Sequence, residues 1–499
     1  WQGRKTVKSI SSTLELYHDR SKKGWLFQTF VKKPCTFLQW VSWHINISNT
    51  SYLNGVIYNV SNAQTERIDK SIEHWTWERY SRLADKLASM EHQYAYLQNM
   101  VTKMQYESNR VPYIAGEKIR IVFLFQIASF YPSWETLYDS CMKDERTDTR
   151  LVFLDETNTE KSQMRTARAF LDNNNMEYEE YENFPLEEFR PHIIVIQTPY
   201  DEWHRKEEHW ANRFRERGFR LVYIPYGIEI SDTEDSHKLH FNTNVINNCW
   251  RIYTFSEIMQ KDYLKYSVNG SAVRALGLPR FDYYFKCRRS LLPDEAEARR
   301  KSRPVVLWKV HFPKVICEKG RDVTVTPALD EYEKFAQEIR KFNELFFILM
   351  PHPKFMEAHR NMEIQMKISS IIETVAASEN AWIDTAEDYR NSLVNADYII
   401  VDRSAVMVEA GALKAPVLYM TNPDYYEPVT EAIKPLVASY YQGTNCKDMC
   451  DFLELCLSGN DYLAMARQKA FAECIPFFDG KCGDRIKEDL INGIFSGED

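Results

Sequence analysis

Three polar residues, Asp402, Arg403 and Ser404, stand between a short apolar run, 398–401, and a stretch of helical character that begins at Ala405. If the apolar run is a buried strand, these residues lie at its carboxyl end, directly ahead of a helix. The N-terminus of a helix offers unpaired backbone N–H groups and the positive end of the helix dipole, so phosphate is its natural ligand. The alternative is a Ser-capped helix in an α/β core that binds nothing.

A carboxylate, Glu409, follows on the same helix. It lies about one turn and a half from the helix start, where it is placed to accept hydrogen bonds from a ribose. Pro416 then opens a second apolar run, 417–420. Strand, helix and strand together make a βαβ unit whose polar residues gather at the carboxyl end of the first strand.

A histidine flanked by prolines, His352, follows another apolar run at 346–350. The prolines fix the backbone around the imidazole. A histidine so placed donates a charge-assisted hydrogen bond to phosphate or protonates a leaving group, while the alternative is a structural histidine in a turn. Trp308 and His311 follow the first strand of the same region, and we count both among the candidate substrate contacts.

The segment 277–282 reads Gly-Leu-Pro-Arg-Phe-Asp, with a flexible glycine and a rigid proline ahead of Arg280. A guanidinium suits the geometry of phosphate, although Arg280 could instead pair with Asp282 inside the loop. The sequence contains no HExxH, no paired CxxC and no DxD-type pair at a strand end, so we expect no metal and no cofactor. It also lacks a P-loop, which leaves ATP hydrolysis without support.

Alternating strands and helices must position these residues. Short apolar runs separated by helices are typical of parallel doubly wound sheets, whose ligands bind at the carboxyl ends of the strands. We expect strands at 119–126, 151–154, 193–197, 221–224, 252–255 and 273–276, then at 305–309, 346–350, 382–384, 398–401 and 417–420. We expect helices at 133–143, capped by Ser133, and at 162–173, 329–342 and 405–413.

The pattern therefore predicts an α/β protein with two Rossmann-like sheets. The first spans 113–286, the second spans 287–499, and a charged stretch at 287–303 links them. Two such sheets leave a cleft between their strand ends, a common site for a nucleotide-activated donor on one side and an acceptor on the other.

Residues 1–112 are expected to form a helical region ahead of the sheets. From Leu83 to Met104 the apolar residues recur at spacings of three and four, which predicts one long helix with a coiled-coil seam. This helix, at 80–104, either joins two subunits or pairs with an earlier helix of the chain.

The first 33 residues hold eight Lys or Arg against two acidic residues, and aromatic residues are interleaved with them. Such a stretch can hold a protein to an anionic bilayer, so we expect a peripheral membrane contact through residues 1–60. The alternative is that these aromatic side chains pack on the following helices.

Composition excludes several classes of protein. The 499 residues carry a net charge of -8, which argues against general nucleic-acid binding. No apolar run is long enough for a membrane span. Ten cysteines without a CxxC pair are typical of reduced thiols in a cytosolic protein. The chain begins at Trp1, so we expect it to be part of a longer protein.

Three segments in order, 277–282, 350–353 and 396–405, resemble motifs of the CDP-glycerol:poly(glycerophosphate) glycerophosphotransferase family. Those enzymes build teichoic acids and related capsule polymers on a GT-B fold. The resemblance implies an N-terminal acceptor domain and a C-terminal CDP-donor domain. It also implies transfer of glycerol phosphate or ribitol phosphate from a CDP-activated donor to a hydroxyl of a growing polymer or lipid-linked primer, with release of CMP.

By the same resemblance, the CDP part of the donor would be held by His352, Arg403, Ser404 and Glu409, and Arg280 would face its phosphates across the cleft. Asp402, Trp308 and His311 complete the expected substrate-binding set. The family commonly has two serines and an aromatic residue after the Asp, where this chain has Arg403, Ser404 and Ala405.

The family's His-Gly-Thr motif, whose histidine is the proposed base, appears here as Tyr226-Gly227-Ile228. The candidate catalytic groups are therefore Tyr226, Glu229, His240 and His352, with His237 near them in sequence.

Two other functions remain open. The first is a GT-B glycosyltransferase that uses a nucleotide sugar, and the second is a non-catalytic assembly module built on the heptad helix. We expect a cytoplasmic protein, peripheral on the inner face of a bacterial membrane, that binds no nucleic acid.

Overall fold

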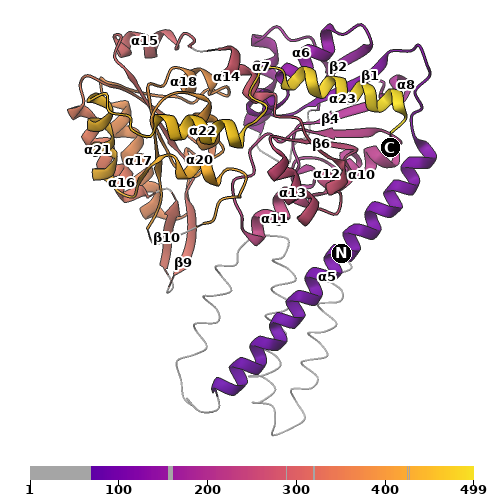
Figure 1. The fold of residues 1–499 in the computed structure, drawn as a ribbon, viewed down its shortest axis with the longest axis horizontal. Helices are drawn as coiled ribbons and strands as arrows, with labels where there is room; N and C mark the ends of the chain where they lie inside the picture. The colour runs from indigo at the N-terminus through magenta and orange to yellow at the C-terminus, as the bar shows by residue number, and fades with distance from the viewer. Residues whose placement is uncertain are drawn as a thin grey trace. The chain divides into compact units, whose positions relative to one another are not determined.

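The computed structural model describes residues 69–154, 161–287, 289–318, 321–326, 328–423, 425 and 427–498 (Figure 1). The basic and aromatic stretch expected to contact a membrane lies outside the described residues. Apart from parts of β9 and β10, every described element belongs to one compact unit, residues 67–315 with 324–499.

The first sheet has seven parallel strands in the order β3-β2-β1-β4-β5-β6-β7. Its strands are β1 Ile119–Phe125, β2 Thr147–Phe153, β3 Glu179–Glu180, β4 Ile193–Ile196, β5 Arg220–Tyr223, β6 Arg251–Thr254 and β7 Val273–Ala275. The central strand β1 is buried at all positions except Arg120, because helices cover both faces of a parallel sheet.

The second sheet has six parallel strands in the order β12-β11-β8-β13-β14-β15. They are β8 Val305–Val310, β11 Phe346–Pro351, β12 Ala381–Ile383, β13 Tyr398–Val401, β14 Val417–Met420 and β15 Tyr441–Gly443. In both sheets the first strand lies between the second and the fourth, which is the doubly wound order. The expected α/β architecture of two parallel sheets is confirmed. A separate two-stranded sheet joins β9 Lys314–Glu318 to β10 Arg321–Thr326.

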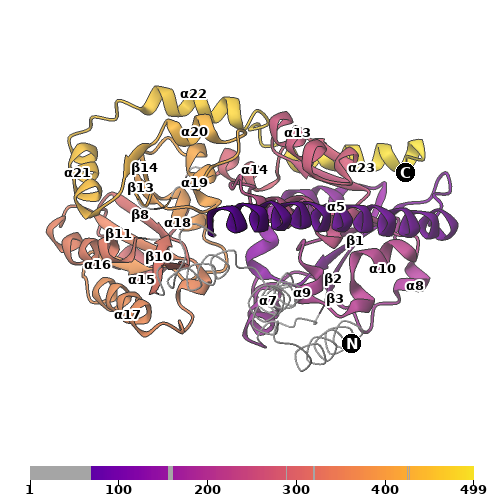
Figure 2. The ribbon, with the colours of Figure 1, turned by 90° about the horizontal axis from the view of Figure 1, so that it is seen from below.

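Helices connect the strands and cover both sheets (Figures 1 and 2). Before and within the first sheet they are α5 Asp69–Asn109, α6 Glu135–Lys143, α7 Lys161–Asn173, α8 Leu186–Phe189, α9 Asp201–His204, α10 Ala211–Glu216, α11 Glu234–Phe241, α12 Asn244–Asn248, α13 Glu257–Tyr266 and α14 Arg280–Lys286. The later ones are α15 Asp294–Arg300, α16 Leu329–Glu338, α17 Met362–Ala376, α18 Arg390–Val394, α19 Val406–Glu409, α20 Lys434–Ala438, α21 Cys446–Leu457, α22 Ala464–Cys474 and α23 Cys482–Ser496. Short 3-10 turns include η2 Ala128–Ser133, η3 Glu207–His209, η4 Gly270–Ala272, η5 Ile339–Lys341, η6 Pro353–Phe355 and η7 Ala410–Ala412.

One expected helix start was wrong, and one expected α-helix is shorter than its segment. Ser133 does not cap α6, because its hydroxyl donates to the carbonyl oxygen of Phe130 (2.7 Å) inside η2, and α6 begins after Trp134. The helix expected at 405–413 is one α-helical turn, α19, followed by the 3-10 turn η7. The charged linker also contains a helix, α15.

The C-terminal helix α23 packs on α6 of the first sheet, whereas α22 packs on α20 of the second (Figures 1 and 2). Asp282 holds the start of α23, because its carboxylate accepts hydrogen bonds from the backbone N–H groups of Cys482 and Gly483 (2.9 Å each) and from the hydroxyl of Thr136 (2.7 Å). Asp282, Asp479 and Cys482 place ligand-type atoms within 4.8 Å of one another, but the Asp282 oxygens already cap the helix.

The helix α5 runs unbroken for 41 residues (Figure 1). Near its C-terminal end it contacts α10, where the Asn109 side chain donates to the carbonyl oxygen of Glu216 (2.7 Å). Exposed apolar side chains on α5 include Leu83, Met90, Tyr94, Leu97, Val101 and Met104. The coiled-coil partner of this stripe stays a prediction. Among the described helices, none combines the length and the apolar character needed to cross a membrane.

Candidate functional site

The carboxyl ends of β8, β11 and β13 meet at the switch point of the second sheet, where the strand order reverses. The register pairs Lys309 of β8 with Met350 of β11 and with Val401 of β13. The backbone N–H of His311 donates to both carboxylate oxygens of Asp402 (3.0 and 2.9 Å). Asp402 therefore ties the ends of β8 and β13 together at the place where a doubly wound sheet binds its ligands.

Two histidines lie side by side at this switch point. The ring centroids of His311 and His352 are 4.9 Å apart, and the Phe312 ring contacts both. The Nδ1 atom of His352 accepts a hydrogen bond from the backbone N–H of Lys354 (3.1 Å), so the proton of the neutral ring sits on Nε2. The His352 ring therefore presents one neutral N–H donor.

Both imidazoles are neutral at pH 7. Burial, together with His311, Lys309 and Lys354, lowers the pKa of His352 to about 2. Burial and the Lys309 ammonium lower the pKa of His311 to about 3. The charge-assisted role expected for His352 therefore requires an anion that raises its pKa.

Arg403 is held by protein groups in this conformation. Its guanidinium donates to the carbonyl oxygens of Glu427 (2.9 Å) and Pro428 (3.1 Å), and to the hydroxyl of Ser231 (2.6 Å) in the first sheet's domain. The Ser404 hydroxyl, by contrast, is buried and has no hydrogen-bond partner among the described residues. Of these two expected phosphate contacts, only Ser404 has an unused donor.

Glu409 and Arg280 form a buried ion pair across the two sheets' domains, with 2.6 Å between Oε1 and Nη1 and exposures of 1% and 3%. The hydroxyls of Tyr284 (3.0 Å) and Tyr389 (2.8 Å) also donate to Glu409. A second guanidinium nitrogen of Arg280 donates to the carbonyl oxygen of Tyr226 (2.6 Å). A ribose contact by Glu409 stays a prediction, and it requires that one of these donors be displaced.

The Trp308 side chain points to the face of the second sheet that α16 covers. Its fully buried ring packs between Tyr332 (5.5 Å between centroids) and Phe335 (4.9 Å) of α16. Successive side chains of a strand alternate between faces, so Trp308 and Lys309 lie on opposite sides of β8. Trp308 is a core residue here and presents no surface to a ligand.

The first sheet contributes Tyr226 and Glu229 after β5. The Tyr226 ring stacks on Phe130 with 3.8 Å between centroids, and burial raises the pKa of its phenol. The buried Glu229 accepts a hydrogen bond from the Tyr263 hydroxyl (2.6 Å) on Oε1, while Oε2 has no partner among the described residues. Burial raises the pKa of Glu229 to about 7, so this carboxyl exchanges its proton near neutral pH.

The two histidines of α11 have neighbours of their own. The His237 ring stacks on Tyr266 (3.9 Å between centroids), and its Nε2 lies 2.7 Å from an Asp232 carboxylate oxygen. Burial lowers the pKa of His240 to about 4. Within the described part of the chain, neither histidine is hydrogen-bonded to Tyr226 or Glu229.

Several residues at the site were missed by the sequence analysis. Lys309 is buried at the switch point, and Tyr284 and Tyr389 surround Glu409. A lysine inside the otherwise apolar strand Val305–Val310 is a signal that could have found the first. The two tyrosines reach Glu409 only through tertiary packing, which leaves no pattern in the local sequence.

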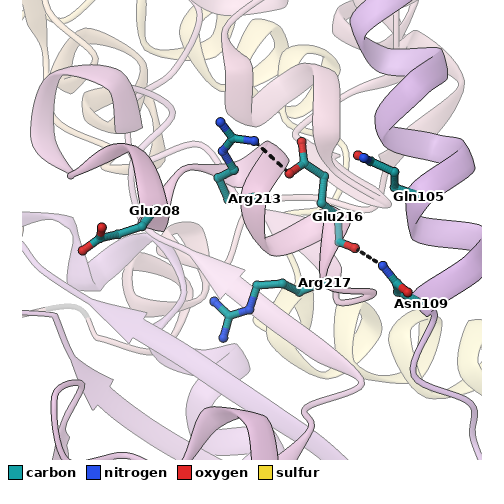
Figure 3. A pocket seen from close by; sticks show the side chains of 6 residues that line it. All are labelled: Gln105, Asn109, Glu208, Arg213, Glu216 and Arg217. Carbon is teal, nitrogen blue, oxygen red and sulfur yellow. Dashed lines mark hydrogen bonds and ion pairs between the residues drawn. The ribbon is translucent and has the colours of Figure 1, made fainter.

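Two cavities lie away from these residues. The first, of about 510 Å³, is lined by Gln105, Asn109, Glu208, Arg213, Glu216 and Arg217. Figure 3 shows the Arg213 guanidinium directed at the Glu216 carboxylate and the Asn109 amide directed at the Glu216 backbone carbonyl, so Glu216 is engaged within the protein. The second, of about 340 Å³, is lined by residues at and just after the carboxyl ends of β2 and β3 and by residues of the η3 region.

Two doubly wound parallel sheets, the second with polar side chains gathered at its switch point, define the GT-B class of fold. A solved variant of the wall teichoic acid polymerase TagF shares it, with 13% identity and a TM-score of 0.51 over 85% of this chain and 99% of that one. A UDP-N-acetylglucosamine 2-epimerase matches with 12% identity and a TM-score of 0.51 over 77% and 98% of the two chains.

The UDP-GlcNAc 2-epimerase from Neisseria meningitidis, bound to UDP-GlcNAc, matches with 10% identity and a TM-score of 0.51 over 75% of this chain and 100% of that one. No family model matches the chain, and no curated protein is similar to it in sequence. At these identities the likeness establishes the fold.

Proposed function

We propose that this chain is a transferase that binds a CDP-activated polyol at the switch point of the second sheet. It moves glycerol phosphate or ribitol phosphate to a hydroxyl of a growing teichoic-acid-like or capsular polymer. The observation that carries the proposal is the convergence of His311, His352 and Ser404 at the ends of β8, β11 and β13. The fold shared with a wall teichoic acid polymerase supports it.

On the donor side, the unused hydrogen-bond donors are the Ser404 hydroxyl and the Nε2–H group of His352. Both suit phosphate oxygens, and fixed donors that meet developing charge usually supply the largest part of catalysis in phosphoryl transfer. A phosphate here also raises the pKa of His352, which strengthens the hydrogen bond that its ring donates.

On the acceptor side, Glu229 is the general base of the proposal. A base with a pKa near the working pH is the most effective, and Glu229 has one unpartnered oxygen. The acceptor hydroxyl gives its proton to Glu229, and its oxygen forms a bond to the distal phosphorus of the donor. The bond from that phosphorus to the bridging oxygen breaks, and CMP leaves with the electron pair. Tyr226 keeps its proton and acts as a hydrogen-bond donor.

The test is a donor panel. The protein is incubated with CDP-glycerol, CDP-ribitol, UDP-sugars and CMP-sugars in the presence of a polyol-phosphate primer, and the released nucleotide is identified. We expect CMP from one of the CDP-polyols. Release of UDP from a UDP-sugar would establish a nucleotide-sugar glycosyltransferase, and tight CDP binding without any release would establish a non-catalytic module.

A further inference from the structure

Lys309 is a buried lysine in the middle of a sheet. It belongs to β8, the central strand at the switch point, and its residue exposure is only 6%. Removing an ammonium group from water is costly unless the group is paired with an anion or fully hydrogen-bonded. A lysine at such a position therefore needs an explanation.

The partners that the protein supplies to Lys309 are weak. Its ammonium makes one long hydrogen bond, 3.4 Å, to the carbonyl oxygen of Val310. Among the described residues no carboxylate oxygen lies within 4.0 Å of its nitrogen. Because Val310 is the last residue of β8, this contact places the ammonium near the carboxyl end of the strand, toward His311 and Asp402.

A second group with unused capacity lies at the same switch point. The Ser404 hydroxyl is buried, has no partner among the described residues, and follows Asp402 by two positions at the end of the neighbouring strand β13. Lys309 pairs in register with Val401 of that strand. An ammonium and a hydroxyl at adjoining strand ends are the donors that a phosphate group takes up.

We infer that Lys309 is a phosphate-binding residue. At the switch point its ammonium, together with the Ser404 hydroxyl, contacts the diphosphate of a nucleotide donor. This deepens the proposed function and rests on it. Lys309 is then a cation of the donor site that lies outside the three motif segments 277–282, 350–353 and 396–405. Arg280 and Arg403 are engaged by Glu409 and by the 427–428 loop, so of these three buried cations Lys309 is the one whose pairing is left to a ligand.

The charge state of Lys309 is compatible with this role. Burial lowers its pKa to about 8, while Asp402, Asp384 and Glu409 act in the opposite direction from a greater distance. The group is therefore still mainly protonated at pH 7, and a phosphate raises its pKa further. A rival account is that Lys309 only balances the buried charge of Asp402, and the experiment must separate the two.

The experiment measures binding to the full chain by titration calorimetry with CDP, UDP and inorganic pyrophosphate as probes. Lys309→Met removes the charge and keeps the length of the side chain, and Lys309→Arg keeps the charge. Lys447→Met, on an exposed face of α21, is the matched control. Lys309→Met/Asp402→Asn tests the balance of charge. Thermal unfolding of each variant reports whether it folds.

We expect Lys309→Met to weaken all three probes by about 10-fold or more, since each loses the same charged hydrogen bond. Lys309→Arg should stay within a few-fold of wild type, and Lys447→Met should be unchanged. The inference is overturned if Lys309→Met binds CDP as wild type does, or if the double variant regains wild-type affinity. Wild-type protein that binds UDP and pyrophosphate but not CDP overturns the proposed CDP donor alone, and wild-type protein that binds neither nucleotide overturns both.

A measurement on the wild type alone covers the case in which Lys309→Met does not fold. At pH 8 the two histidines stay neutral and Asp384, Asp402 and Glu409 are the acidic groups that face Lys309. CDP bound at Lys309 raises the pKa of the ammonium, so binding should be accompanied by net proton uptake, seen as a dependence of the binding enthalpy on the ionisation enthalpy of the buffer. Binding without proton uptake at pH 8 would contradict the inference.

Discussion

In the proposed reaction, Glu229 is the residue of the first sheet's domain that takes the proton of the acceptor hydroxyl. It is buried, it shares one oxygen with the Tyr263 hydroxyl, and its other oxygen is unused among the described residues. The histidine expected from the family motif is replaced by Tyr226, whose phenol keeps its proton. Glu229 could be named as a candidate from the sequence. What distinguishes it from the other candidates is its burial, which depends on tertiary contacts such as the one with Tyr263.

If Glu229 is the base, Glu229→Gln should lower turnover by on the order of 10²-fold or more, because Gln has nearly the same shape and cannot take a proton. Its affinity for CDP should not change, because the proposed CDP site lies on the second sheet. Steady-state kinetics and CDP titration measure the two effects. Tyr226→Phe is the matched control and should retain turnover within about tenfold, since it loses only a hydrogen bond. Full turnover by Glu229→Gln would remove Glu229 from the mechanism.

The same variant gives a prediction for stability. The raised pKa of Glu229, about 7 against 4.5, means that between these pH values the folded protein holds a proton that the unfolded chain releases. The free energy of unfolding of the wild type therefore falls as the pH rises through this window and levels off above it. Relative to wild type, Glu229→Gln should gain on the order of 2 to 3 kcal/mol between pH 5 and pH 8.

Urea unfolding at the two pH values measures this gain. Glu234→Gln, which removes an exposed carboxylate on α11, is the matched control. A stability difference between Glu229→Gln and wild type that does not change with pH would mean that Glu229 is ionised throughout the range.

At the scale of elements, two loops bind the sheets' domains to each other beside the site. The backbone N–H of Asp232 donates to Pro428 (3.0 Å), and that of Thr430 donates to Ile230 (3.1 Å). The Thr430 hydroxyl donates to the carbonyl oxygen of Glu229 (3.0 Å). The loop after β5 that carries the proposed base is thus held by the loop after β14, and Arg403 closes the contact.

We expect Arg403→Ala to loosen this contact, because its guanidinium alone reaches Ser231 and both backbone carbonyls of the 427–428 loop. Hydrogen exchange at 230–232 and 428–430 should rise, and turnover should fall by about 10-fold or more through misplacement of the base. Arg403→Lys should behave similarly, since lysine lacks the planar fork.

Lys314→Ala is the control for this prediction. Lys314 also contacts the Glu427 carboxylate (3.2 Å), yet it is half-exposed and the contact stays within the second sheet's domain. Unchanged exchange at 230–232 in Arg403→Ala would show that the backbone pairing holds the loop without the guanidinium.

The sequence predicted the apolar strands well and the side-chain contacts between distant elements poorly. β13 and β14 begin and end where their apolar runs do, because burial on both faces sets the composition of each strand. β3 reads Glu-Glu and β15 reads Tyr-Gln-Gly, so neither strand contains an apolar run that would reveal it. Arg280 was expected to face phosphate or pair with Asp282, but it pairs with Glu409, 129 positions away, and sequence alone gives no means to find that partner.

At the scale of the whole described unit, buried polar contacts join the two sheets' domains. Arg280 and Glu409 form one such contact, and Arg390 of α18 reaches Glu135 of α6 in another. The helix α23, held by Asp282, adds the C-terminal end of the chain to the first sheet's domain. The residues of the candidate site are therefore set in place by contacts between segments far apart in the sequence.

Breaking the buried Arg280–Glu409 pair should lower the free energy of unfolding much more than breaking an exposed ion pair does. Glu409→Gln leaves a buried guanidinium without its counter-ion, and we expect a loss of about 3 to 5 kcal/mol in the free energy of unfolding. The exposed pair of Lys447 and Asp451 is the matched control, and Asp451→Asn should cost less than about 1 kcal/mol. Urea unfolding measures both, and a Glu409→Gln variant as stable as wild type would show that the pair does not hold the domains together.

The proposed transfer breaks the bond between the distal phosphorus of the donor and the bridging oxygen. Phosphorus-31 NMR of a reaction with CDP-glycerol and a glycerol-phosphate primer tests it most directly, because each product has its own resonance. We expect CMP and a new phosphodiester in equal amounts, and on the order of 10²-fold slower formation of both with Glu229→Gln. Release of CDP, or an unchanged donor in the presence of folded protein and primer, would contradict it.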